Sequence, residues 1–503
     1  MSDSFYITTP IYYVNDIPHI GHAYTTILAD VLSRYQKQVG NKPFFLTGLD
    51  EHGQKVQDAA KDRGIETQDH CDEMSKRFIS LWERLHISND DFIRTTEIRH
   101  KNVVREILKT VFDVGDIYED EYQGLYSVSE ERFITEKEAD TGQFRDIKTL
   151  KEKNYFFRMS KYQDRLINHI EANPNFIQPD HRKNEILGFL NQPLNDLCIS
   201  RPKSRLNWGI ELPFDSDYVT YVWFDALINY ITAPGYLDDK SLFKKFWPAD
   251  IHLIGKDILT THAVYWPTML MSAGIKLPKM IFAHGWWLMD KEKMSKSSGN
   301  VINPMDLIDD YGVDPVRYYL MREMVLGQDA NFTVKSFINR YNSDLANDLG
   351  NLLSRISTLI QKNYDRQIPE EHSPGNKEKE IKDKSIELVK NFDKNMSSLS
   401  INEAIEETLQ FVRSINRYFE HKAPWKLVKE DLESAGTVLY TGAEALRICA
   451  ILLSPVMPKR MKLLLSILNT ESTDRTWGNL NPGKFLGEHK PLFPRINSEN
   501  ITC

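Results

Sequence analysis

Cysteine is scarce in this chain of 503 residues, which has only Cys71, Cys198, Cys449 and Cys503. The four lie far apart, and no two have the CxxC or CxxH spacing of a zinc site or a redox dithiol. The chain is also too long for a disulfide-stapled miniprotein. This cysteine usage fits a reducing compartment, and we expect a cytoplasmic protein.

Long hydrophobic runs and an excess of positive charge are also missing. No run of about 18 apolar residues occurs, and residues 1–9 lack the features of a secretory signal, so neither membrane spanning nor secretion is expected. The 63 Lys and Arg are outnumbered by 71 Asp and Glu, which gives a net charge of −8. This balance argues against a protein that coats DNA or RNA through a basic surface.

Strand and helix signals alternate at the start of the chain and again after residue 250. Apolar strands are expected at residues 5–8, 43–47, 250–255 and 279–285, and helices at 24–35, 55–62 and 259–273. Residues 10–21 have the composition of a turn. Strands that alternate with helices predict a parallel sheet of the α/β class.

Two other regions depart from this alternation. Residues from about 115 to 215 are rich in Glu, Lys, Asn and turn residues, and we interpret them as an insertion between two halves of one sheet. After residue 345 the strand signals stop. Apolar residues at helical spacing, among them Leu345, Leu352, Ile405 and Val412, predict an antiparallel helical bundle with a loop at 367–384.

Two histidines occur where the first turn enters a helix, in the sequence His19-Ile20-Gly21-His22. Side chains three residues apart share a face of a helical turn, beside the N–H groups and positive dipole of the helix N-terminus. Such an arrangement binds phosphate, and Gly21 lets a base or ribose approach the backbone. Judged alone, the motif could equally be two capping or surface histidines.

A second motif, Lys293-Met294-Ser295-Lys296-Ser297, precedes another serine and a glycine. Two ammonium groups on a Ser/Gly-rich loop are mobile charges that can follow a phosphate oxygen as charge develops in a transition state. A solvated lysine loop is the alternative. Both motifs in this order favour the functional interpretation.

The two motifs resemble the HIGH and KMSKS signatures of class I aminoacyl-tRNA synthetases, and the surrounding sequence resembles the methionyl-tRNA synthetase family over nearly the whole chain. Its landmarks are PIYYVN at 10–15, GLDEHG at 48–53, YVWFDA at 221–226, IGKDI at 254–258, NLLSR at 351–355 and APW at 423–425. The resemblance implies a Rossmann-like catalytic domain in two halves (1–114 and 216–290), an inserted connective domain (115–215), a KMSKS loop and linker (291–345) and an α-helical anticodon-binding domain (346–503).

The implied reaction has two steps. The methionine carboxylate attacks the α-phosphate of ATP, pyrophosphate leaves, and the terminal adenosine of tRNA(Met) then takes the methionyl group. Such transfers need charge neutralisation and alignment more than covalent catalysis. The resemblance assigns the catalytic role to His19, His22, Lys293 and Lys296, with Mg²⁺ on the phosphates, and adds to the ATP site Gly21, Met294, Ser295 and Ser297.

The resemblance also implies a methionine site in which Asp50 binds the α-ammonium group. The side-chain pocket, where soft sulfur would pack against aromatic rings, is assigned to Ile11, Tyr13, Trp223, Ala226, Leu227, Tyr230, Ile258 and His262. Asp50 alone could be a helix cap, and Trp223 and Tyr230 could be ordinary core residues at helical spacing. Leu227 stands where some relatives have proline, which weakens that assignment.

For tRNA, the resemblance assigns Asn351, Arg355 and Trp425 to the CAU anticodon, since a tryptophan can stack on an unpaired base while the other two read its edge. Asn351 and Arg355, four residues apart on a helix, could instead be a solvated pair. Ser127 and Ser129 replace the cysteines of a zinc knuckle found in many relatives, so no structural zinc is expected. We expect no appended β-barrel tRNA-binding domain after the bundle, and therefore a monomer.

Two other functions stay open on the residues alone. An HxGH turn also serves small adenylyltransferases, so the chain could be another nucleotidyltransferase, although the bundle and the KMSKS motif disfavour this. It could also be an inactive homologue that acts as an RNA-binding or scaffold protein. The intact histidines and lysines of both motifs argue against that reading.

Overall fold

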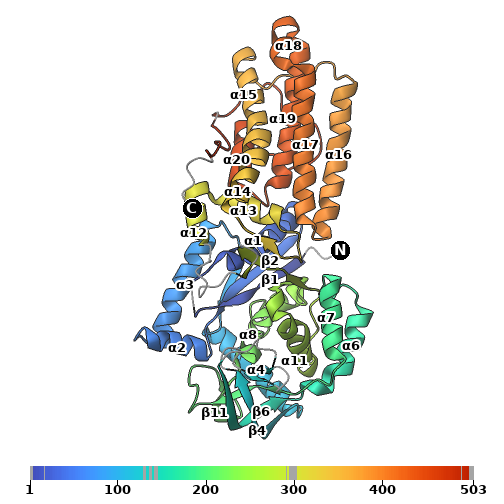
Figure 1. Ribbon diagram of the computed structural model, residues 1–503. Helices are drawn as coiled ribbons and strands as arrows, with labels where there is room; N and C mark the ends of the chain where they lie inside the picture. The colour runs from blue at the N-terminus through green and yellow to red at the C-terminus, as the bar shows by residue number, and fades with distance from the viewer. Residues whose placement is uncertain are drawn as a thin grey trace. The chain divides into compact units, whose positions relative to one another are not determined.

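A computed structural model of the chain describes residues 4–15, 17–127, 132–134, 139–140, 146–289, 292–293, 303–488 and 490–497. The chain forms two compact units, Met1–His284 and Gly285–Cys503. The first contains a parallel Rossmann-like sheet and the second is largely helical (Figure 1). The predicted fold class is therefore confirmed.

Six parallel strands form the main sheet of the first unit, in the order β3-β2-β1-β12-β13-β7. Their bounds are β1 (Ser4–Tyr13), β2 (Lys42–Asp50), β3 (Asp91–Arg94), β7 (Ile177–Gln178), β12 (Ile251–Gly255) and β13 (Ile281–His284). Because β1 pairs with both β2 and β12, the two sequence regions that carry strand signals belong to one sheet.

Helices connect these strands, as the alternation predicts. The expected first helix is α1 (Ile20–Gln38), and its apolar stripe is buried, with Ile27 and Val31 fully inaccessible to solvent. The others on this side of the insertion are α2 (Gln54–Asp62), α3 (Thr67–Arg84) and α4 (Ile98–Asp113). Burial of one helix face against the sheet supplies the driving force for this layer.

The turn expected at residues 10–21 starts later than predicted, because β1 continues to Tyr13. Pro10 cannot donate a ladder hydrogen bond, and its presence in the sequence therefore suggested that the strand ends there. The strand instead shifts register against β2 between Thr8 and Ile11 and resumes pairing, so that Tyr13 lies opposite Asp50. The irregularity absorbs the proline without ending the strand.

Two smaller antiparallel sheets lie between β3 and β12 in the sequence. One has the order β5-β4-β6-β8, and the other β10-β11-β9. The elements of this stretch are β4 (Ile117–Ser127), β5 (Arg132–Ile134), β6 (Ile147–Phe157), η1 (Met159–Tyr162), α6 (Gln163–Ala172), α7 (Asp180–Leu190), β8 (Leu197–Cys198), β9 (Ser200–Pro202), β10 (Glu211–Leu212) and β11 (Asp215–Thr220). Strand β7, from the same stretch, joins the main sheet; at two residues it is too short to show a pattern.

Short helices follow β11 and β12 and complete the first unit. They are α8 (Val222–Ala226), α9 (Asn229–Thr232), α10 (Lys240–Phe246), η2 (Lys256–Ile258), η3 (Thr261–Tyr265) and α11 (Trp266–Ser272). The single helix expected at 259–273 is interrupted, because η3 is π-helical. Pro267 lacks the N–H that would bond the carbonyl of Ala263, so an α-helical ladder cannot run through this point.

The second unit begins with a small sheet of order β15-β14-β16 and continues as helices. Its elements are β14 (Trp287–Met289), β15 (Glu292–Lys293), α12 (Pro304–Tyr311), α13 (Val313–Glu323), β16 (Ala330–Asn331), α14 (Val334–Arg340), the π-helical η5 (Tyr341–Gly350), α15 (Asn351–Asn363), α16 (Asn376–Ser397), α17 (Ile401–Lys422), α18 (Pro424–Glu430), α19 (Leu432–Leu453) and α20 (Pro458–Ile467).

The long helices form the predicted bundle around α19, which packs against α15, α16, α17, α18 and α20 (Figure 1). Leu345, Leu352, Ile405 and Val412 are all buried, as their spacing predicts. The prediction of a loop at 367–384 is wrong for its second half, since helix α16 already begins at Asn376. The many charged residues of this segment made the few apolar residues at helical spacing, which face the bundle, difficult to recognise.

Helix α19 is long and apolar enough to cross a membrane, and it is the one such helix among the described residues. Its apolar window is entirely buried within the unit. That burial is what the central helix of a bundle requires.

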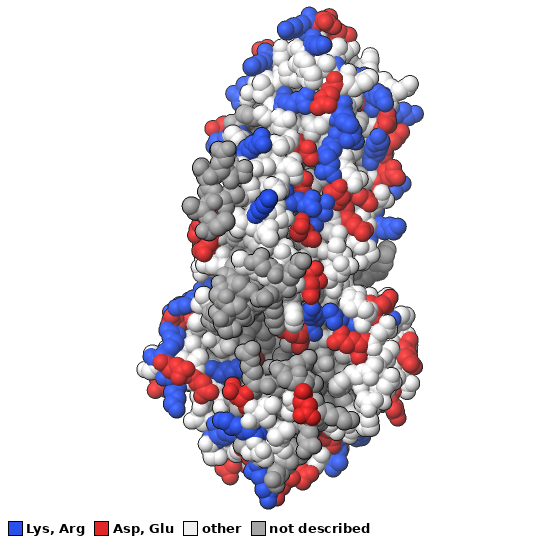
Figure 2. Space-filling model, viewed as in Figure 1, with Lys and Arg blue, Asp and Glu red and all other residues white. Residues whose placement is uncertain are grey.

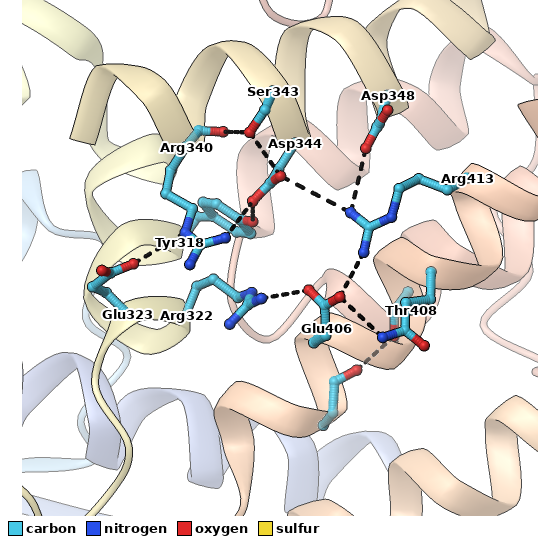
Figure 3. Close-up of polar contacts among 12 residues, drawn as sticks. Tyr318, Arg322, Glu323, Arg340, Ser343, Asp344, Asp348, Glu406, Thr408 and Arg413 are labelled. Carbon is cyan, nitrogen blue, oxygen red and sulfur yellow. Dashed lines mark hydrogen bonds and ion pairs between the residues drawn. The ribbon is translucent and has the colours of Figure 1, made fainter. Parts of the chain in front are cut away.

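Ion pairs join α13, η5 and α17 in the second unit (Figure 3). Arg413 Nη2 lies 2.6 Å from Glu406 Oε1 and Arg413 Nη1 lies 3.4 Å from Asp348 Oδ2, while Arg322 pairs with the other oxygen of Glu406. The Tyr318 hydroxyl donates to Asp344 at 2.7 Å. Because η5 runs directly into α15, this network fixes the start of α15 against its neighbours.

Candidate active site

Four of the nine predicted methionine residues lie at or just after the carboxyl ends of the central strands. Ile11 and Tyr13 end β1, Asp50 ends β2, and Ile258 follows β12, which pairs with β1 on its other side. In the ladder Tyr13 lies opposite Asp50, and Asp50 is only 5% exposed. Ligands of open α/β sheets bind at this edge, where parallel strands end together.

The two histidines of the HIGH motif form the N-terminal cap of α1. His19 is the N-cap residue, and its Nδ1 accepts a hydrogen bond from the Gly21 N–H at 3.1 Å. The Nδ1 of His22 accepts in turn from the His19 N–H at 3.2 Å. The half-buried rings stack with their centroids 3.8 Å apart. A Cβ on Gly21 would lie 2.9 Å from Cε1 of the His19 ring, so any larger residue would displace that ring.

These bonds settle which nitrogen carries the proton in the neutral rings. A backbone N–H can only donate, so Nδ1 of each ring accepts and Nε2 holds the hydrogen. The motif therefore caps the helix with one nitrogen of each ring and carries an N–H on the other, at the positive end of a 19-residue helix. The capping and phosphate-binding interpretations of this motif are compatible.

Tyr230 and His262 form a buried polar contact in the predicted side-chain pocket. The Tyr230 oxygen lies 2.8 Å from His262 Nε2, and His262 Nδ1 lies 2.9 Å from the Ile258 carbonyl. A carbonyl only accepts, so Nδ1 carries the proton and Nε2 accepts from the Tyr230 hydroxyl. Burial lowers the pKa of His262 to about 4, so this wall of the pocket is uncharged at neutral pH.

The predicted side-chain pocket contains partly buried and almost fully buried residues. Ile11, Tyr13, Trp223 and Ile258 are partly buried and pack on the edge of the hydrophobic core, and the Trp223 ring lies 6.3 Å from that of His262. Three others are almost fully buried: Ala226, Leu227 and Tyr230. These three contribute to the core, and their role toward methionine stays a prediction.

Most of the KMSKS motif, Met294, Ser295, Lys296 and Ser297, lies outside the described residues, as does Ser129 of the expected zinc-free stretch. The backbone of Lys293 belongs to β15 and pairs with Leu288 of β14. The prediction for this motif therefore stays a prediction. Among the residues that the structure describes, no three His, Cys, Asp or Glu side chains are grouped in a way that could hold a metal ion.

The predicted anticodon residues come from two helices of the bundle. The guanidinium of Arg355, on α15, lies over the ring of Trp425, on α18, at 4.9 Å from the ring centroid. Trp425 is 39% exposed, and Asn351 is exposed one turn before Arg355. This cation–π contact holds Arg355 over one face of the Trp425 ring, and the residue as a whole stays partly exposed to solvent. The structure thus brings together two residues that are 70 positions apart.

Sequence reasoning missed a buried cluster next to the pocket, formed by Asp225 and two histidines, His52 and His100. Asp225 and His52 lie within the landmark segments of the resemblance, but no chemistry was assigned to them. His100 lies on α4 with no motif to mark it, and only the fold brings it to Asp225.

Comparisons with known proteins agree over the whole chain. A family model described as "tRNA synthetases class I (M)" matches residues 5–143 and 143–357, and the "Anticodon binding domain of methionyl tRNA ligase" matches residues 368–501. A methionine–tRNA ligase of Rickettsia conorii is 46% identical over 99% of this chain and 100% of that protein. One of Fusobacterium nucleatum is also 46% identical, over 99% of this chain and 81% of that protein.

Solved structures lead to the same family. Mycobacterium tuberculosis methionyl-tRNA synthetase in complex with methionyl-adenylate superposes with a TM-score of 0.94 at 40% identity, covering 98% of this chain and 100% of that one. Full-length likeness of this kind, together with both signature motifs, settles the classification: the chain belongs to the methionyl-tRNA synthetases, a family of class I aminoacyl-tRNA ligases.

Proposed function

We propose that the chain carries out the methionine–tRNA ligase reaction with the side chains described above. The observation that carries the proposal is the shared sheet edge, where the histidine pair at the start of α1 follows the strand whose last residue lies opposite Asp50. A nucleotide phosphate and an amino acid bound at this edge would be neighbours, which is what adenylate formation needs.

In the first step a methionine carboxylate oxygen bonds to the α-phosphorus of ATP, and the bond to the bridging oxygen breaks to release pyrophosphate. ATP enters as its magnesium complex. The Nε2–H groups of His19 and His22 donate to phosphate oxygens, and Asp50 orients the substrate by binding its α-ammonium group. Lys293 and Lys296 supply further positive charge. These groups act by electrostatic stabilisation and alignment, the main needs of phosphoryl and nucleotidyl transfer.

In the second step a ribose hydroxyl of the terminal adenosine of tRNA attacks the carbonyl carbon of the adenylate, and AMP leaves. The neutral pocket wall formed by Tyr230 and His262 suits an uncharged thioether.

Asn351, Arg355 and Trp425 bind the anticodon of tRNA(Met). We also propose that the enzyme is a monomer and acts in the cytoplasm. Figure 2 shows acidic and basic side chains interspersed over the visible face, so tRNA binding would depend on local contacts rather than on net charge.

We expect pyrophosphate exchange into ATP to depend on methionine. With a panel of the 20 amino acids, methionine should support exchange at least about 100-fold better than isoleucine, leucine or valine, because branched side chains do not fit a site shaped for an unbranched thioether. The measurement is the initial rate with each amino acid at equal concentration. Preference for another amino acid would overturn the substrate assignment.

Replacing Trp425 by alanine should impair tRNA charging and spare methionine activation. Loss of one stacking platform costs about 1–3 kcal/mol, or roughly 5- to 150-fold in kcat/KM for tRNA(Met). Exchange without tRNA should stay within about twofold of wild type, since Trp425 lies in the helical bundle and not in the sheet unit.

Two further variants make this result specific. Trp425→Phe keeps an aromatic face and should recover part of the loss. Phe485→Ala removes another exposed aromatic side chain of the same unit, 55% accessible to solvent, and should leave charging unchanged. Unimpaired charging by Trp425→Ala would remove this residue from the anticodon site.

A further inference from the structure

A fully buried carboxylate joins three segments beside the proposed methionine site. Asp225, on α8, has both oxygens occupied: Oδ2 lies 2.6 Å from His52 Nδ1, and Oδ1 lies 2.7 Å from His100 Nε2. His52 belongs to the loop after β2 and His100 to α4, and all three residues are at most 3% exposed. Since a carboxylate only accepts, each ring donates to it, and these short bonds fix both ring orientations.

The charge on this carboxylate is retained despite its burial. Burial raises the pKa of the Asp225 carboxyl, but the neighbouring His52 and His100 outweigh that effect and lower the pKa to about 2. An apolar side chain could fill the same space without the desolvation penalty of a buried charge. Unlike an apolar side chain, the carboxylate accepts directional hydrogen bonds, and these hold His52 and His100, from two different elements, at defined positions.

The segments that Asp225 joins each carry residues of the proposed site. His52 follows Asp50 by two residues, and Trp223 and Ala226 flank Asp225 on α8. The loop is held from its other side by Trp208, whose indole N–H donates to the Glu51 carbonyl at 2.6 Å and whose own carbonyl accepts from the Gly53 N–H at 3.3 Å. Residues 51–53 are therefore fixed between Trp208 and Asp225.

We infer that Asp225 is a positioning residue for methionine, which acts through His52 on the loop that follows Asp50 and thereby holds Asp50 at the correct distance from Trp223 and Ala226. The inference rests on the proposed methionine-binding roles of those three residues. A small zwitterionic substrate touches both segments at once, so a shift between them weakens its binding while the ATP site at the start of α1 is left in place.

The test is steady-state pyrophosphate exchange by the full-length chain carrying Asp225→Asn. The amide keeps the size of the carboxyl group but can accept a hydrogen bond from only one of the two rings. We expect KM for methionine to rise at least about tenfold, while KM for ATP stays within about twofold. A purely structural role would lower the melting temperature and the active fraction without separating the two KM values.

A matched control is Asp116→Asn. Asp116 is also a buried carboxylate, 1% exposed, and accepts from Lys161 at 2.6 Å, Ser272 at 2.8 Å and the Tyr162 hydroxyl, none of which is a predicted site residue. This variant should lower the melting temperature and leave KM for methionine unchanged.

Variants of His52 test the same contact if Asp225→Asn folds poorly. His52→Asn can still donate to Asp225 from the position of Nδ1 and should keep KM for methionine near that of wild type, whereas His52→Leu should raise it as Asp225→Asn does. Equal effects of the two His52 variants, or equal changes in both KM values, would overturn the inference. Absence of methionine-dependent exchange in the wild-type chain would instead overturn the proposed function itself.

Discussion

Replacing His19 by asparagine should lower the kcat of methionine-dependent exchange by about 10²- to 10³-fold, the usual effect of removing one donor to a developing charge. Asparagine retains an acceptor where His19 Nδ1 now accepts from the Gly21 N–H, and it is among the best N-cap residues. It has no group at the position of Nε2. The free energy of unfolding should therefore change by less than about 1 kcal/mol. Initial exchange rates and urea denaturation measure the two effects.

The reciprocal variant separates capping from catalysis. His19→Gln places an amide nitrogen near the position of Nε2 but leaves the Gly21 N–H without its acceptor. We expect it to recover part of the exchange activity and to lose about 1 kcal/mol of stability. If His19→Asn were as active as wild type, the motif would be a helix cap without a role toward ATP.

Local patterns predicted those parts of the fold in which one face of an element is buried. The stripe on α1 and those of the bundle were recognised because apolar residues recur every three to four positions, and all of these helices form. The errors arise where tertiary contacts override composition. Pro10 lies inside β1 because the register shifts around it, and α16 forms at Asn376 although the sequence there is dominated by charge.

In the candidate site too, residues that are close in sequence could be predicted, and contacts between distant residues could not. His19 and His22 were found because they are close in sequence and their spacing carries chemistry. The contact of Arg355 with Trp425 and the bonds from Asp225 to His52 and His100 join residues that are 70 to 173 positions apart. No local pattern predicts such pairs, because only the packing of distant elements creates them. The contact of Arg413 with Asp348, 65 positions away, belongs to the same class (Figure 3).

Replacing Arg447 by methionine should destabilise the second unit by about 3–5 kcal/mol, the usual result of removing one partner of a buried ion pair. Arg447 and Glu444 are completely buried on α19, with 2.7 Å between Nε and Oε2. Arg447 also donates to the carbonyls of Asp474 and Thr476. Methionine fills the space but leaves a buried carboxylate without its counter-charge. Hydrogen exchange of α19 amides reports the loss in this unit separately from the sheet unit.

A double variant identifies the cause of the loss. In Glu444→Gln with Arg447→Met, the buried charge is gone, and the amide oxygen can still accept from the Gly478 and Asn479 N–H groups that Glu444 Oε1 binds at 2.7 and 3.1 Å. If the unpaired charge dominates, this double variant should be more stable than Arg447→Met alone. If it is less stable, the bonds from Arg447 to the two carbonyls matter more than the ion pair. In that case the pair serves mainly to fasten the segment after α20 onto the central helix, which is why a charge is tolerated in the middle of the most apolar helix of the bundle.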